Sequence, residues 1–161
     1  SALNQLQSDQ LMYWRVEGTQ AQIIEISGLS VEQLSKLIVN IDLYQQLNSI
    51  QQQAISAIHL KQSQVLSLMQ GDLIIGKRYI AACHDLVSMT QAQKIGCDAI
   101  LLSPVVATET HPETRALGWA QFKVLTSQVE IPVFALGGMQ AGDLPEAQQQ
   151  GAYGIAGIRF L

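Results

Sequence analysis

The chain has 161 residues, of which 48% are hydrophobic and only 14% are charged. This length suits one domain with a substantial core, and the formal net charge of −4 argues against nucleic-acid binding, which needs a basic face. No apolar run approaches the ~20 residues of a membrane span and no signal-peptide pattern opens the sequence, so we expect a cytoplasmic domain with no membrane partner.

Apolar runs recur along the chain and predict eight strands. Residues 1–10 are polar and are expected to be a linker or frayed end, which leaves 11–161 as the predicted domain. Most runs are continuous rather than alternating, which is typical of parallel strands buried on both faces. The runs cover residues 12–16, 22–26, 37–41, 55–60, 79–83, 99–103, 132–136 and 154–158.

Helical patterns separate the later strands. Residues 86–95 have apolar positions at helical spacing and stop before Gly96, a common helix end. One amphipathic run follows Gly118, and another follows Asp143, a candidate N-cap. Strands that alternate with helices predict an α/β fold of the TIM (β/α)8 barrel type.

The first two strand candidates fit this barrel poorly. Only the short stretch around Gly18 separates residues 12–16 from 22–26, whereas parallel neighbours need a crossover of roughly a dozen residues. The two runs therefore form a hairpin, or one of them is not a barrel strand. We predict a shortened barrel, with helices missing or reduced in its first two units.

Glycines follow the last two predicted strands. Gly137 and Gly138 come after one of them, and Gly157 lies at the end of the other. In parallel α/β proteins, ligands bind at the carboxyl ends of strands. Glycine there lets bare N–H groups approach an anion such as phosphate. The pattern predicts a phosphate site, with a plain tight turn as the structural alternative.

Several segments together resemble the thiamine phosphate synthase/TenI superfamily of barrels. The likeness is carried by Asp98–Val105, Leu117–Trp119 and Pro132–Arg159. It is nearest to a branch in which this barrel is fused behind a Nudix (MutT-like) hydrolase domain, with shared features at Ala82–Asp85 and Thr110–Pro112. No Nudix box occurs here, so any hydrolase chemistry belongs outside this sequence.

The resemblance implies that loops after the last two strands hold a substrate phosphate. The matching residues are Gly137, Gly138, Gly157, Ile158, Thr108 and Thr110. Arg159 stands where the family usually has a serine, and its guanidinium either grips the phosphate or pairs with an acid. His111 replaces a lysine that neutralises that phosphate, and histidine is only fractionally charged near neutral pH.

The resemblance also implies a Mg²⁺ cofactor, for which this chain keeps one carboxylate. Asp42 matches a family aspartate linked to Mg²⁺, but Lys61–Gln64 stand where the second aspartate is expected. One carboxylate without a bound diphosphate holds Mg²⁺ poorly. Glu25 occupies the position of a strand arginine that grips the diphosphate, so both the metal pair and the cationic grip are broken.

Three residues are candidates for catalysis: His84, Ser103 and His111. The tautomerases of the superfamily use a histidine where this chain has Ser103, and a serine without an adjacent base is a poor proton shuttle. His84, beside Asp85, lies at the neighbouring strand end and is either an acid–base residue or an ordinary hydrogen-bonding residue. His111, before Pro112, either lines the ligand mouth or is a plain loop residue.

Three functions follow from these residues. The first is a barrel domain that binds a phosphorylated small molecule of the thiamine pathway, as the accessory domain of a Nudix fusion. The second is active thiamine phosphate synthesis, and the third is a tautomerase that uses His84 and Ser103. Apolar surface left by missing helices predicts self-association or packing against a Nudix domain.

Overall fold

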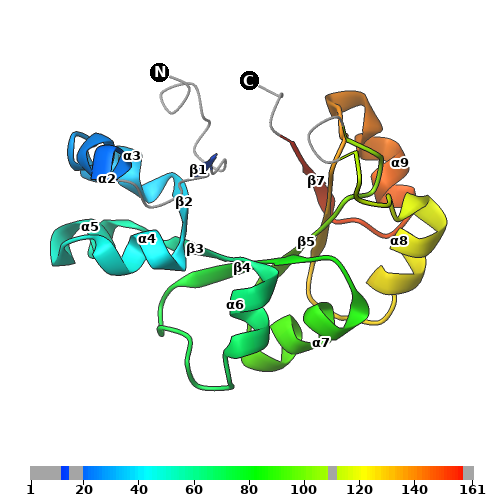
Figure 1. Cartoon of the computed structure of the whole chain (residues 1–161), viewed down its shortest axis with the longest axis horizontal. Coiled ribbons are helices and arrows are strands. Elements are labelled where there is room, and N and C mark those ends of the chain that lie inside the picture. Colours follow the sequence, from blue (N-terminus) through cyan, green and yellow to red (C-terminus); the bar gives the residue numbers. More distant parts are fainter. Residues whose placement is uncertain (1–11, 15–19, 109–111, 158–161) are drawn as a thin grey trace. The chain divides into compact units, whose positions relative to one another are not determined.

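The computed structural model describes residues 12–14, 20–108 and 112–157 (Figure 1). Its described residues form two compact units. The first unit runs up to Leu60 and includes Leu73–Tyr79, and the second contains Lys61–Asp72 and the residues from Ile80 onward. Each unit is an α/β structure in which the paired strands are parallel.

The first unit contains three strands, β1 to β3, in the order β1-β2-β3. Short helices connect them, two in each crossover. The strands are β1 (Met12–Trp14), β2 (Leu37–Asn40) and β3 (Ala57–Leu60); the helices are α2 (Gln20–Ser27), α3 (Val31–Ser35), α4 (Ile41–Gln46) and α5 (Ser49–Ala54). Helices were predicted to be missing or reduced in these units, and the structure has them in reduced form.

The predicted strand over residues 22–26 is wrong, because these residues lie in α2. Ile26 is fully buried while Ile24 is 66% exposed, so the apolar run has one buried side, as a surface helix requires. β1 pairs in parallel with β2, which also excludes the hairpin. Glu25 lies on the exposed side of α2, so it does not take the place of a strand arginine.

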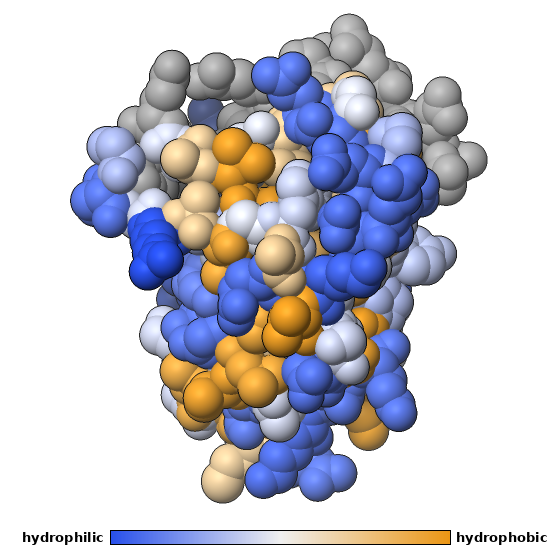
Figure 2. Space-filling model, turned by 90° about the vertical axis from the view of Figure 1, so that its right-hand side faces the viewer, coloured by the Kyte–Doolittle hydropathy of each residue, from blue (hydrophilic) through white to orange (hydrophobic). Residues whose placement is uncertain are grey.

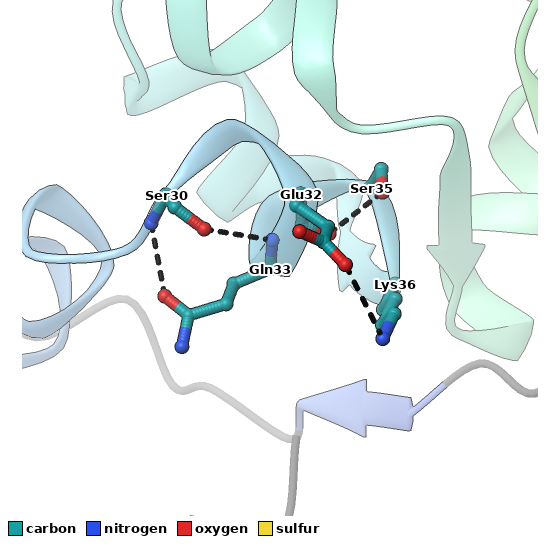
Figure 3. Close-up of polar contacts among 5 residues, drawn as sticks. All are labelled: Ser30, Glu32, Gln33, Ser35 and Lys36. Atoms are coloured by element: carbon teal, nitrogen blue, oxygen red, sulfur yellow. Dashed lines mark hydrogen bonds and ion pairs between the residues drawn. The ribbon is translucent and has the colours of Figure 1, made fainter. Parts of the chain in front are cut away.

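Side-chain caps define where these short helices begin. At α3, the backbone N–H of Gln33 donates to Ser30 Oγ at 3.1 Å, and the N–H of Ser30 donates to Gln33 Oε1 at 3.0 Å. Figure 3 shows this reciprocal pair beside the Lys36–Glu32 ion pair, whose charged atoms are 3.9 Å apart. Such capping boxes satisfy N–H groups that a short helix leaves without partners.

The second unit contains four parallel strands in the order β4-β5-β6-β7. The strands are β4 (Arg78–Cys83), which starts in the first unit, β5 (Ala99–Leu102), β6 (Val133–Leu136) and β7 (Gly154–Ala156); the helices are α6 (Gln62–Ser67), α7 (Leu86–Ile95), α8 (Gly118–Thr126), the 3-10 turn η1 (Ala141–Asp143) and α9 (Leu144–Gln149). The predicted helix over residues 86–95 is confirmed, and Gly96 ends it with a left-handed φ of 98°.

Asp143 stands at the N-cap of α9 as predicted, but its side chain makes no capping bond to that helix. Its Oδ2 instead accepts from the backbone N–H of Gln140 at 2.8 Å. The carboxylate therefore shapes the turn η1, one step before the helix that we expected it to cap.

Burial alternates along the strands of the second unit. One set of side chains is fully or almost fully buried, and includes Ala81, Cys83, Ile100, Leu102, Val133 and Ala135. The residues between them, such as Leu101 and Phe134, are only half-buried. The helices of this unit lie along one face of its sheet (Figure 1), and the alternation places the fully buried set toward them.

Seven strands lie in the described residues, so the count of eight units is not confirmed. None of the helices within the described ranges is long and apolar enough to cross a membrane. Cys83 and Cys97 are both buried free thiols, so each packs as a small apolar residue. Burial raises the pKa of Cys83 to about 11 and that of Cys97 to about 12.

Candidate functional site

The two glycines after β6 form a turn that strongly favours glycine. Gly137 has a φ of 98° and Gly138 a φ of 69°, values that other residues rarely adopt. A Cβ on Gly137 would lie 2.8 Å from Pro104 Cα, and one on Gly138 would lie 3.0 Å from Val106 Cβ. The loop after β6 therefore packs directly against the loop after β5.

Backbone hydrogen bonds fix the loop after β5 against these glycines. The N–H of Val105 donates to the carbonyl of Leu136 at 3.0 Å, and the N–H of Val106 donates to that of Gly137 at 3.2 Å. The carbonyls of Pro104 and Val105 accept from Leu117 and Gly118, each at 2.9 Å. The turn is thus held in place by main-chain contacts, as a preformed anion site requires.

The other predicted phosphate ligands are only partly described. Gly157 follows β7, which pairs in parallel with β6, so the ends of both strands lie at the same edge of the sheet. Gly157 is exposed and Thr108 is half-buried. The remaining predictions, Thr110, His111, Ile158 and Arg159, lie outside the described residues.

His84 and Ser103, predicted at neighbouring strand ends, are brought together. The ring Nδ1 of His84 lies 2.8 Å from the carbonyl oxygen of Ser103 and 3.4 Å from its Oγ. The N–H of Ser103 donates to the Cys83 carbonyl at 3.2 Å, which continues the pairing of β4 with β5. Ser103 is followed by Pro104, which packs against Gly137, so this serine lies between His84 and the loop that contacts Gly137.

Gln62 is a site residue that the sequence analysis missed. It begins α6, and its Oε1 accepts from the backbone N–H of His84 at 2.7 Å and from Ser88 Oγ at 3.0 Å. Its Nε2 donates to Asp85 Oδ2 at 3.4 Å. In the sequence, Lys61–Gln64 stand out only because they lack a second metal-binding aspartate. An amide that follows a buried strand was the available signal, since it offers a donor and an acceptor.

In the first unit, the polar residues at the strand ends bind one another. The Asn40 amide nitrogen lies 3.3 Å from both the carbonyl and the Nδ1 of His59, and Asn40 Oδ1 accepts from the N–H of Asp42 at 3.0 Å. Asn40 is 3% exposed and His59 is 5% exposed. Asn40 thus caps α4 and holds His59, which indicates a structural role for both.

The donor set around Asp42 does not fit Mg²⁺. Asp42 lies in the first turn of α4, where a carboxylate also favours the helix dipole. Across the described residues, no three His, Cys, Asp or Glu side chains come together in a way that could hold a metal ion. Mg²⁺ needs several hard oxygen ligands, so no reaction step is assigned to a metal here.

Two surface hollows of the second unit lie away from these strand ends. One, of about 380 Å³, is lined by residues such as Pro132 and Tyr153, which precede β6 and β7 at the opposite edge of the sheet. The other, of about 550 Å³, lies between α6 and α7 and is lined by residues that include Leu66 and Val87. Neither coincides with the glycine turn.

Comparisons with known proteins agree with the resemblance. A family model described as "Thiamine monophosphate synthase" matches residues 15–161. A protein of Aquifex aeolicus (strain VF5) that carries a thiamine-phosphate synthase name is 41% identical over 80 residues, which are 50% of this chain and 43% of that protein. A thiamine-phosphate synthase of Prochlorococcus marinus (strain MIT 9303) is 31% identical over 102 residues, which are 63% of this chain and 29% of that protein.

A solved structure supports the same fold. The thiamine phosphate pyrophosphorylase from Pyrococcus furiosus superposes with a TM-score of 0.61 at 19% identity, and the match covers 92% of this chain and 70% of that one. This likeness concerns the fold and is consistent with a TIM-like barrel. The chain matches less than half the length of the two curated relatives above. Because the family model spans nearly all of the sequence, the chain belongs to the thiamine monophosphate synthase (TMP-TENI) family.

Proposed function

We propose that this chain is a thiamine phosphate synthase-like domain that binds a phosphorylated small molecule, a precursor or product of the thiamine pathway. The observation that carries the proposal is the glycine turn Gly137–Gly138, whose backbone conformation and close packing exclude side chains. Such a turn presents main-chain N–H groups to an anion. Gly157, at the end of the neighbouring strand β7, completes the proposed anchor.

Catalysis of the synthase reaction itself is the alternative. That reaction needs a cation to stabilise the departing pyrophosphate, and the described residues contain no group of three His, Cys, Asp or Glu side chains that could hold a metal ion. His111 and Arg159, the predicted cationic contacts, lie outside the described ranges. We therefore favour binding over synthesis, with the phosphate anchor kept and the diphosphate apparatus reduced.

One assay separates these two functions. The protein is incubated with the pyrimidine diphosphate, the thiazole phosphate and Mg²⁺, and thiamine phosphate is measured. The binding proposal expects product at the level of the protein-free control. Turnover that rises with protein concentration, and disappears when Mg²⁺ is chelated, would establish the synthase instead.

A proton-transfer reaction is a second candidate function, and the contact between His84 and Ser103 favours it. The imidazole lies at the carboxyl edge of the same parallel sheet as the glycine turn. A ligand anchored by its phosphate at this edge would bring its ring toward the end of β4. Ser103 without an adjacent base is expected to be a poor shuttle, and His84, the acid–base candidate from the sequence, has the more suitable chemistry.

Association with a Nudix domain or with a second copy remains part of the proposal. Figure 2 shows apolar patches separated by polar side chains on the face that carries α8 and α9. Exposed apolar residues of these helices include Val124 at 56% and Leu144 at 37%. Light scattering of the purified chain tests self-association: a monodisperse monomer at high concentration would exclude it.

A further inference from the structure

The hollow at the starts of β6 and β7 is separate from the glycine turn. Its volume is about 380 Å³, which lies within the size range of small-molecule sites. Pro132 and Tyr153 line it, and they come directly before β6 and β7. Gly137 and Gly138 come after β6, so the length of the strand separates the hollow from the turn. A ligand in this hollow is therefore not the one that the turn would anchor.

Hydrogen bonds and close packing fix the walls of this hollow. The N–H of Tyr153 donates to the carbonyl of Val133 at 2.8 Å, which joins the starts of the two strands. Gly151 has a φ of 95°, and a Cβ there would lie 2.8 Å from Thr126 Oγ1. The end of α8 and the turn before β7 are therefore in direct contact, which gives the hollow firm walls before a ligand arrives.

Glu130 gives the hollow a negative charge. It is the only charged side chain among the described residues that line the hollow, and Lys123, in the last turn of α8, is not one of them. The N–H of Glu130 donates to Gln93 Oε1 at 2.6 Å, which holds its backbone in place. Helix α8 also ends at the hollow, with Thr126, and the carbonyls at a helix C-terminus carry partial negative charge. The electrostatics of the hollow therefore favour a cation.

An exposed aromatic ring and an apolar wall indicate which kind of cation fits. Tyr153 is 69% exposed, and its ring centroid lies 5.5 Å from that of Phe134, a contact that restricts its movement. A positively charged group is attracted to the face of such a ring. Val129, Ile131 and Pro132 add apolar surface to the hollow. These features suit a flat organic cation, whereas a divalent metal ion needs several oxygen ligands.

The hollow between α6 and α7 has the opposite charge and serves as an internal comparison. Its volume is about 550 Å³, and its described lining includes Lys94 but no acidic side chain. A cation placed there would meet a like charge beside the apolar side chains of Leu66 and Val87. Of the two hollows, only the one that contains Glu130 therefore suits a cation.

We propose that the hollow at the starts of β6 and β7 is a binding site for a small, flat organic cation, which the carboxylate of Glu130 and the ring of Tyr153 hold. This site is additional to the proposed phosphate site and does not depend on it. The two sites lie at opposite ends of β6, so one molecule of the protein can bind an anion at one edge of the sheet and a cation at the other.

The first test compares N-methylquinolinium with quinoline, an uncharged compound of nearly the same shape. Each is titrated into ¹⁵N-labelled protein at low ionic strength and at a pH that leaves quinoline neutral, and backbone amide shifts are followed by NMR. We expect saturable shifts with the cation at residues 129–133 and 151–153, and binding of quinoline that is weaker by ~3-fold or more. Shifts confined to residues 86–94, no saturable shift, or equal affinity for the two compounds would overturn the proposal.

The second test changes the two named side chains. Glu130→Gln keeps the shape and removes the charge, and we expect it to bind the cation ~3-fold more weakly and quinoline as before. Tyr153→Leu removes the ring and should weaken cation binding by ~2–5-fold. Glu146→Gln removes an exposed charge of α9 outside the lining and should bind like the native protein. Unchanged cation affinity in Glu130→Gln or Tyr153→Leu, or an equal loss in Glu146→Gln, would overturn the proposal.

Discussion

The strand ends of the two units carry similar residues but use them differently. In the first unit, Asn40 and His59 are buried and bind each other. In the second unit, His84 is exposed, and the turn at Gly137–Gly138 contributes backbone rather than side chains. Buried polar side chains that hydrogen-bond to each other stabilise the fold. Exposed polar side chains and backbone N–H groups remain available to bind a ligand.

The largest expected effect comes from adding one carbon to the glycine turn. Gly137→Ala must accommodate a left-handed φ of 98° and a contact of 2.8 Å with Pro104 Cα. We expect a loss of unfolding free energy above ~2 kcal/mol, because backbone strain alone costs about 1–2 kcal/mol. Urea denaturation measures this value.

A matched control isolates the packing part of that loss. Gly71 has a φ of 99°, but a Cβ there would meet nothing within 4 Å. Gly71→Ala therefore carries the backbone strain without the clash and is expected to cost less than Gly137→Ala. Equal losses of unfolding free energy for the two variants would show that close packing of the loop after β5 adds nothing to the cost at Gly137.

The second effect concerns a lysine that stabilises the first unit. Nζ of Lys77 donates to the carbonyls of Gln52 and Ile55, at 2.6 Å and 2.5 Å, at the end of α5. Lys77→Met keeps the aliphatic stem and removes these charged hydrogen bonds. We expect a loss of ~1.5–3 kcal/mol in urea denaturation. Lys123→Met, on the exposed side of α8, should stay within about 0.5 kcal/mol of the native protein.

Asn40→Ala tests whether the first unit uses its strand ends for stability. The variant loses the cap of α4 and the contacts to His59, and an N-cap alone is worth ~1 kcal/mol. Asn48→Ala removes a cap of α5 and serves as the comparison. We expect the larger loss for Asn40→Ala in chemical denaturation, with phosphate affinity unchanged. Weaker phosphate binding in this variant would contradict the division of roles.

The smallest effect is a dependence of stability on alkaline pH. Burial raises the pKa of the Cys83 and Cys97 thiols above the ordinary value of 9.0. Above pH 9 the unfolded chain loses these protons while the folded chain keeps them, so the unfolding free energy falls as pH rises toward 11. The double variant Cys83→Ala and Cys97→Ala should show a shallower decline between pH 8 and 10. An identical slope would contradict the assignment.

Much of the second unit could be predicted from the sequence, because its strands are apolar runs and its helices have clear ends. Gly96 stops α7 and glycines follow β6, as each pattern indicated. The first unit was harder, because residues 22–26 are apolar enough for a strand yet form one side of α2. In so short a run, burial on one side decides the structure, and burial depends on the rest of the fold.

The candidate site was predictable at its glycines and less so at its side chains. The positions of His84 and Ser103 at adjacent strand ends followed from the spacing of the runs. Which atom of each makes the contact did not, because that depends on ring orientation and on the path of the chain through Pro104. The role of Gln62 required knowledge that the start of α6 lies beside the end of β4.

The most direct measurement of the central claim is a calorimetric titration of thiazole phosphate into the native protein and into Gly138→Asp and Gly138→Asn. The two side chains have the same shape, and both meet the same φ of 69° and the same 3.0 Å contact with Val106 Cβ, so the difference between the variants reports the added negative charge. We predict binding by the native protein, binding by the asparagine variant at reduced strength, and none by the aspartate variant. Equal binding by the two variants would show that no phosphate lies at the glycine turn.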